Sequence, residues 1–134
     1  MKKSQNFRYY YLPLILYAVV IYGFSCLHKV PLPHLDKLST DKIYHAIEFS
    51  ILGYLLMRVM NFKLSGKSVW IMVVITTIIG ALYGISDEIH QYYVPGRYFS
   101  YWDMAADTVG SLLGCWLYLK FRHKTEKLFK FLNR

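Results

Sequence analysis

The sequence predicts an all-α, polytopic membrane protein with four transmembrane helices and both termini in the cytoplasm. Three observations predict this fold: an apolar composition, four separate apolar runs, and an uneven distribution of basic residues between the loops. Of 134 residues, 55% are hydrophobic and 18% are aromatic, and the mean hydropathy is +0.26. A soluble domain usually needs less apolar sequence than this, so the lipid bilayer is the expected partner.

The four apolar runs cover residues 9–27, 43–60, 69–85 and 102–119. Each is roughly 17 to 19 residues long, near the lower limit for a helix that crosses a bilayer. A soluble bundle would show a polar stripe along each helix, and the first, third and fourth runs show none. Between the runs lie typical helix breakers, in Val30-Pro31-Leu32-Pro33, at 61–68 and around Pro95-Gly96. We expect a single domain over residues 1–134.

The basic residues predict the orientation of the chain. Twelve of the 16 Lys and Arg residues lie in the N-terminus, the C-terminus and the middle turn, to which we assign Arg58, Lys63 and Lys67. Because positive residues are retained in the cytoplasm, both termini should be cytoplasmic and the two other loops should face outward. The basic tail, 120–134, should lie as an amphipathic helix on anionic headgroups. No nucleic-acid partner is expected, because the excess charge of +8 flanks apolar runs.

The chain contains two cysteines, Cys26 and Cys115, and both lie inside apolar runs. They form no C-x-x-C motif, no disulfide framework and no zinc-binding set. We therefore expect both to be small packing residues.

Acidic residues gather at the predicted outer ends of the second, third and fourth helices. Six of the eight acidic residues lie there: Asp41, Glu48, Asp87, Glu88, Asp103 and Asp107. Asp41, His45 and Glu48 are spaced i, i+4, i+7, so they share one face of a helix and extend about 10 Å along it. Ionisable groups at this depth are costly and are functional candidates. The alternative is a polar network that only joins the helices.

Small residues precede or follow the acidic residues on the third and fourth helices. The two patterns are Gly80-x-x-x-Gly84-x-x-Asp87-Glu88-x-x-Gln91 and Asp103-x-x-x-Asp107-x-x-Gly110-x-x-x-Gly114. Such strips let helix backbones approach closely. We expect these two helices to pack glycine face to glycine face, which would bring Asp87 or Glu88 and Gln91 opposite Asp103 and Asp107.

The loop between these two helices contains a turn and one arginine. Pro95-Gly96 predicts a type II turn, since Pro fixes the first corner and Gly supplies a positive φ. Arg97 should then point back towards the carboxylates or a ligand, because its planar fork suits phosphate or carboxylate. The alternative for Arg97 is a salt bridge to Asp103.

The charges of this region do not balance. Six carboxylates against two cations, Lys42 and Arg97, leave four negative charges uncompensated when histidine is neutral. Compensation could come from protonated carboxyl groups, protonated histidine, a divalent cation or a cationic group of a substrate. Carboxylate and imidazole ligands would accept calcium, magnesium, manganese or zinc, but no stringent ligand motif is present. The cofactor is left open, with a divalent cation as one candidate.

Two separated motifs resemble the VanZ-like family. They are Asp41-Lys42-x-x-His45-x-x-Glu48-Phe49-x-x-Leu52-Gly53 and Ser86-Asp87-Glu88-x-x-Gln91-x-x-Val94-Pro95-Gly96-Arg97-x-x-Ser100-x-x-Asp103-x-x-x-Asp107-Thr108-x-Gly110-x-x-x-Gly114. The resemblance covers about residues 25–118. It implies a small multi-pass protein of the bacterial cytoplasmic membrane, related to a protein associated with resistance to the glycopeptide antibiotic teicoplanin.

Three functional hypotheses follow. The first is an outward-facing polar pocket that binds or modifies a cell-envelope component, such as a lipid-linked wall precursor, and lowers glycopeptide susceptibility. Its binding residues would be Asp41, Lys42, Gln91, Arg97, Asp103 and Asp107. The second is an outer-leaflet hydrolase or transferase with His45, Glu48, Asp87 and Glu88 as acid-base groups, acting on a lipid-linked or phosphate-bearing substrate. The third is a structural network, with function residing in partner proteins.

Overall fold

The structure is a computed structural model that describes residues 6–27 and 37–132, and these residues form helices joined by short connections. A π-helical turn, η1 (Phe7–Tyr11), leads into α2 (Leu12–Ser25). The other helices are α3 (Lys37–Lys63), α4 (Val69–Tyr92) and α5 (Tyr101–Leu132). The described residues contain no strand, so the predicted all-α fold is confirmed. The Val30-Pro31-Leu32-Pro33 segment lies outside the described residues.

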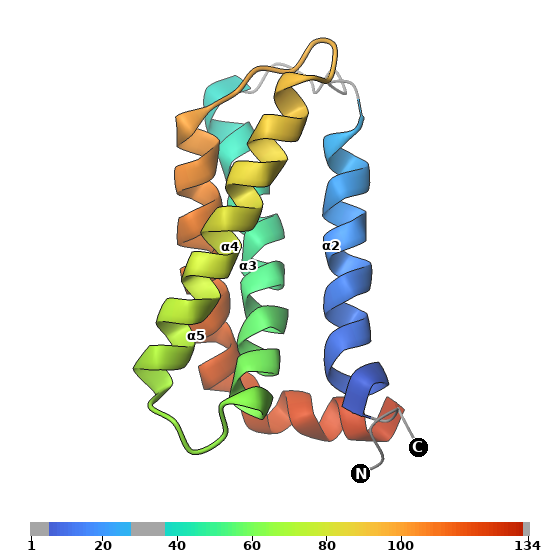
Figure 1. Ribbon diagram of the computed structural model, residues 1–134, viewed down its shortest axis with the longest axis vertical. Coiled ribbons are helices and arrows are strands. Elements are labelled where there is room, and N and C mark those ends of the chain that lie inside the picture. The colour runs from blue at the N-terminus through green and yellow to red at the C-terminus, as the bar shows by residue number, and fades with distance from the viewer. Residues whose placement is uncertain (1–5, 28–36, 133–134) are drawn as a thin grey trace.

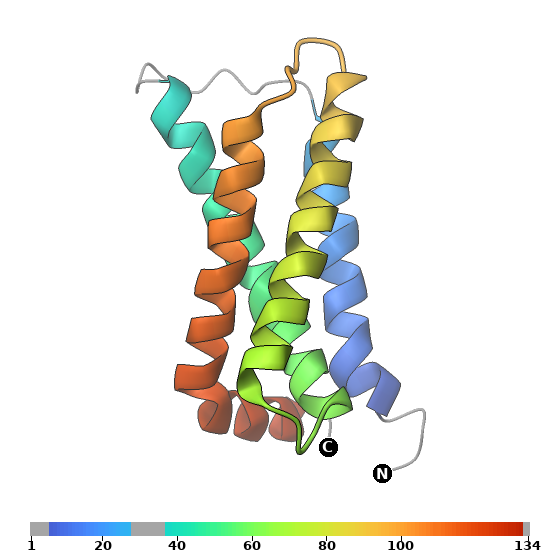
Figure 2. The same cartoon turned by 60° about the vertical axis from the view of Figure 1, so that its left-hand side comes forward.

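The helices run side by side as an elongated bundle (Figure 1). We call the end that carries the α4–α5 connection, residues 93–100, the loop end. The opposite end, with the α3–α4 connection at residues 64–68, is the tail end. The first part of α5 runs along the bundle, whereas its last part turns and crosses the tail end next to η1 (Figures 1 and 2).

Within residues 6–27 and 37–132, three segments are long and apolar enough to cross a membrane: Phe7–Ser25, Thr40–Lys63 and Val69–Tyr92. The helix α5 is a fourth element of the bundle, and its apolar stretch is interrupted by Asp103 and Asp107. The protein is thus a polytopic membrane protein. Large aromatic side chains around the loop end are strongly exposed, as expected for a belt at the membrane interface: Tyr92, Tyr93, Tyr98, Tyr101 and Trp102.

Several helices extend beyond the apolar runs that predicted them. The run 43–60 lies in the longer α3, and the run 69–85 lies in α4, which continues to Tyr92. The run 102–119 lies in α5, which continues to Leu132 as the predicted tail helix. Hydropathy marks where a helix is apolar, but polar residues such as Glu, Gln and Lys propagate a helix equally well. Asp87 and Glu88 therefore lie within the regular helix α4.

The expected contact between two glycine faces is wrong. Gly80 and Gly84 of α4 do face α5, where a Cβ added at Gly84 would lie 2.7 Å from Asp107 Oδ2. Gly110 and Gly114 of α5 instead face α3, where an added Cβ at Gly114 would meet the backbone nitrogen of Tyr54 at 2.6 Å. The α5 helix therefore presents its glycines to α3 and its acidic side to α4.

The two cysteines differ in their environments. Cys115 is almost fully buried and packs with Met57, Met72 and Tyr118, as predicted. Cys26 is exposed, and its Sγ lies 3.2 Å from His90 Nε2, so its assignment as a packing residue is wrong. The α2 helix ends at Ser25, and Cys26 follows it as the C-cap residue.

Candidate functional site

Three helices and one connection bring all ten predicted site residues to the loop end. The α3 helix contributes Asp41, Lys42, His45 and Glu48, α4 contributes Asp87, Glu88 and Gln91, the connection contributes Arg97, and α5 contributes Asp103 and Asp107. We call these ten residues the loop-end cluster. Six of them are buried, namely His45, Asp87, Glu88, Gln91, Asp103 and Asp107. The structure therefore brings the predicted residues together at one end of the bundle, as the spacing predicted.

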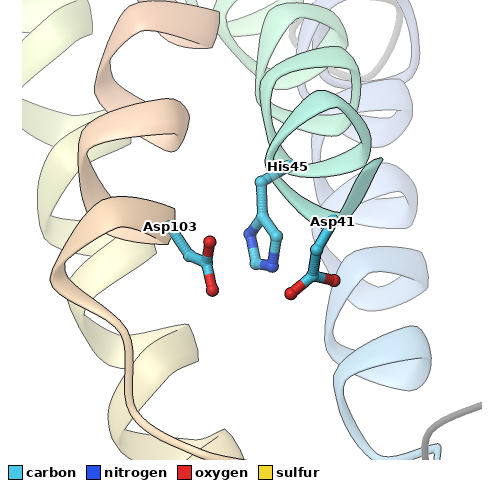
Figure 3. Close-up of side chains that lie close together, drawn as sticks. All are labelled: Asp41, His45 and Asp103. Carbon is cyan, nitrogen blue, oxygen red and sulfur yellow. The ribbon is translucent and has the colours of Figure 1, made fainter. Parts of the chain in front are cut away.

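The centre of the cluster is a histidine–carboxylate pair between α3 and α5. His45 Nδ1 donates a hydrogen bond of 2.9 Å to Asp107 Oδ1, and both side chains are buried. Figure 3 shows the imidazole ring of His45 between the carboxylates of Asp41 and Asp103. Because Asp107 holds one ring nitrogen, it fixes the orientation of the imidazole.

Lys42 pairs with Asp103 across α3 and α5. The Nζ of Lys42 lies 2.8 Å from Asp103 Oδ1, and the lysine side chain remains 28% exposed while the aspartate is almost buried. Lys42 is therefore the basic partner of Asp103, a role that the alternative prediction gave to Arg97. Among the described residues Arg97 makes no ion pair, so the proposed salt bridge between Arg97 and Asp103 is wrong.

Arg97 joins the cluster through an amide. Its Nε donates to Gln91 Oε1 at 3.1 Å, and Gln91 Nε2 donates in turn to Asp87 Oδ2 at 2.6 Å. The predicted turn sets this direction, because Gly96 has a φ of 81° and the Arg97 nitrogen donates to the Val94 carbonyl. A type II turn therefore aims Arg97 back towards the carboxylates, as expected.

Two buried carboxylates are only half satisfied. Glu88 is 0% exposed, and the Ser100 backbone nitrogen donates to its Oε2 at 2.8 Å. Glu88 Oε1 has no hydrogen-bond partner among the described residues, and neither has Asp107 Oδ2. Buried polar atoms are normally hydrogen-bonded, so two such oxygens in one cluster need an explanation.

Glu48 lies deepest along the α3 face, three residues beyond His45. Its side chain is half-buried. Its backbone carbonyl accepts a hydrogen bond from the Tyr17 hydroxyl, which connects α2 to the same region. The face predicted from the i, i+4, i+7 spacing therefore points into the bundle along its whole length.

Comparison with known proteins adds the family. A model of the VanZ/LLP1 family matches residues 5–122, which is most of the chain. The chain belongs to the VanZ/LLP1 family. No curated protein matches it, and no solved structure matches it.

This VanZ/LLP1 protein also contains polar residues in the region that the sequence patterns did not single out. Ser111 is fully buried, and its Oγ has no hydrogen-bond partner among the described residues. It follows Asp103 and Asp107 at the same four-residue interval on α5, so continuing that spacing would have found it. Ser25, the last residue of α2, is also buried, and its hydroxyl has no hydrogen-bond partner within the described part of the chain.

The described residues of this VanZ/LLP1 protein contain two groups of potential metal ligands. Asp41, His45 and Asp103 form one group, and His45, Asp87 and Glu88 form the other. In each group one ligand atom from every residue lies within 4.8 Å of the others. Both groups contain imidazole nitrogen and carboxylate oxygen, a donor set that divalent transition metals accept.

Proposed function

We propose that this VanZ-like membrane protein binds the polar head of a cell-envelope component, such as a lipid-linked wall precursor, at the loop-end cluster. The observation that carries the proposal is the gathering of buried ionisable side chains from three helices at one end of the bundle. Such residues are expensive in a membrane protein and mark ligand pathways or sites. A head group could offer a cationic group to the surplus carboxylates and a phosphate or carboxylate to Arg97.

The cluster contains groups for both signs of charge. Arg97 is half-buried, and its one described hydrogen-bond acceptor is Gln91 Oε1, so most of its donors remain for a phosphate or carboxylate. Lys42 stands nearby but is held by Asp103. The carboxylates of Asp87 and Glu88 would meet an amine or a cation.

The proposed orientation places the loop end outside the bacterial cytoplasmic membrane and both termini inside. The basis is the positive-inside rule applied to the 16 basic residues. An alkaline phosphatase fused after residue 134 should be inactive, whereas the same enzyme inserted at Tyr98 should be active. The reverse pattern would place the cluster at the cytoplasmic surface and remove the outer-leaflet ligand.

Arg97 gives the direct test of ligand binding. The protein would be reconstituted in nanodiscs, and its binding of a polyprenyl-diphosphate-linked wall precursor measured by native mass spectrometry. Arg97→Ala should reduce binding at least tenfold, because it removes the cluster's guanidinium, which has no ion pair among the described residues and would donate hydrogen bonds to the phosphate. Arg122→Ala, which removes an exposed arginine of the tail end, is the matched control and should bind normally. Equal binding by both variants would remove this role of the loop-end cluster.

A consequence for antibiotics follows from the family. By binding a wall precursor, the protein would lower susceptibility to glycopeptides such as teicoplanin. Expression in a susceptible strain should raise the inhibitory concentration of teicoplanin, and Arg97→Ala should cancel the increase at equal protein abundance. An increase that survives Arg97→Ala would separate resistance from the cluster.

The alternative is an outer-leaflet hydrolase or transferase, and the His45–Asp107 pair favours it. A carboxylate that orients an imidazole is a common arrangement for a general base, with Glu48, Asp87 or Glu88 as further acid-base groups. Purified protein incubated with a lipid-linked or phosphate-bearing substrate would release a new head-group product, detectable by mass spectrometry. His45→Gln should abolish that product, and absence of turnover by the wild type with any divalent metal would reject the enzyme.

A further inference from the structure

We propose that His45, Asp87 and Glu88 bind one divalent cation of the manganese or zinc type inside the loop-end cluster. The three residues come from α3 and α4, all are buried, and each offers a ligand atom within 4.8 Å of the other two. The inference deepens the proposed function and rests on it, because the ion would share the site of the head group.

An independent observation comes from Glu88. Its side chain is completely buried, and the Ser100 backbone nitrogen fixes the carboxylate through Oε2. The other oxygen, Oε1, has no hydrogen-bond partner among residues 6–27 and 37–132. Burying a carboxylate oxygen without a donor is costly, and a coordinated cation would remove that cost.

Asp107 supports the same site as a positioning residue. It accepts the hydrogen bond from His45 Nδ1 at 2.9 Å. In a neutral imidazole this leaves the lone pair of Nε2 for a metal, and a carboxylate behind a metal-binding histidine is the usual supporting contact. Asp107 would therefore act through His45.

The charges around Asp87 and Glu88 call for a cation. The nearby lysine, Lys42, is paired with Asp103, and Arg97 makes its hydrogen bonds to the Gln91 amide. Asp87 and Glu88 have no ion pair among the described residues, so one divalent ion would neutralise both. A mixed set of nitrogen and oxygen ligands suits Mn²⁺ or Zn²⁺ better than Ca²⁺ or Mg²⁺, which prefer oxygen alone.

The second group, Asp41, His45 and Asp103, is a weaker candidate and supplies the control. Asp41 is half-buried rather than buried, and Asp103 already uses Oδ1 for Lys42. Within the described part of the chain neither side chain has a buried oxygen without a partner. Asp41→Asn therefore removes a nearby acidic charge without removing a proposed ligand.

The experiment measures ion binding by the full chain in nanodiscs after treatment with EDTA. Mn²⁺ binding would be followed by electron paramagnetic resonance, Zn²⁺ by competition, and folding by thermal unfolding. The wild type should bind one ion per chain and unfold at a higher temperature when loaded. Glu88→Gln should bind no ion, and without ion it should be at least as stable as the wild type because a buried charge is gone. Asp107→Asn should weaken binding about 10- to 100-fold.

Two controls complete the test. Asp41→Asn should keep wild-type ion binding, and Asp87→Asn repeats the test with a second ligand if Glu88→Gln does not fold. No ion uptake by the wild type would overturn the proposal, and so would binding that survives Glu88→Gln and Asp87→Asn but is lost in Asp41→Asn.

Head-group binding is measured with and without ion in the same samples. If the head group binds but no ion does, only the cation site is rejected. If the ion binds but the head group does not, only the proposed function is rejected.

Discussion

The two ends of the bundle each hold a polar cluster, but the clusters differ in how their charges are matched. At the tail end, Arg58 is fully buried, and its Nε donates to Glu126 Oε1 at 3.1 Å. The guanidinium also donates to the Tyr9 carbonyl at 2.6 Å and lies 4.3 Å from the centre of the Tyr9 ring. The hydroxyl of Tyr9 donates to Glu126 Oε2, so the carboxylate is satisfied at both oxygens.

The loop-end cluster has the opposite balance. Its carboxylates outnumber its cations, and two buried oxygens, on Glu88 and Asp107, have no hydrogen-bond partner in the described chain. A cluster whose charges pair with one another serves to close the structure, whereas one with surplus charge is built to meet something else. We therefore assign packing to the tail end and ligand binding to the loop end.

The largest expected effect tests the tail end. Arg58→Ala should lower the free energy of unfolding by about 3 kcal/mol or more, because it removes a fully buried side chain together with its ion pair to Glu126 and its hydrogen bond to the Tyr9 carbonyl. The measurement is denaturation by SDS in mixed micelles. Ligand binding by the folded fraction should be unchanged, and wild-type stability of this variant would contradict the packing role.

A smaller effect is expected where the bundle is packed most tightly. Gly114→Ala should cost about 1 to 3 kcal/mol, because its Cβ would meet the backbone of α3. Gly23→Ala is the matched control, since nothing lies within 4 Å of the added carbon and alanine favours a helix. Both variants are compared by the same SDS titration. Equal stability of the two would mean that α3 and α5 are less closely packed than described.

The smallest effect is expected at the loop end. Lys42→Ala also removes a cation from a carboxylate, yet it should cost about 1 kcal/mol or less because the lysine is partly exposed. Asp103 would keep a second source of stabilisation in this variant, because it lies in the first turn of α5, where the helix dipole favours a negative charge. A loss as large as that of Arg58→Ala would show that both clusters are structural.

The sequence was most informative where spacing alone decides position. The i, i+4, i+7 interval places Asp41, His45 and Glu48 on one face, and Pro95-Gly96 determines the turn that directs Arg97. These two predictions required no knowledge of neighbouring helices.

Spacing could not identify partners across helices. It could not show that the glycines of α5 face α3, or that Lys42 rather than Arg97 pairs with Asp103, because both depend on how each helix is rotated in the bundle. Arg58 looked like a basic residue of the middle turn. Its burial depends on the last part of α5 crossing the tail end, and a local pattern does not reveal that contact.

A high-resolution experimental structure of the protein extracted with its native lipids would show whether the loop-end cluster holds a ligand. We expect density for a polar head group or a cation among Glu48, Asp87 and Arg97, in contact with Glu88 Oε1 or Asp107 Oδ2. Helix ends that separate these side chains, or carboxylates satisfied entirely by the protein's own donors, would contradict this expectation.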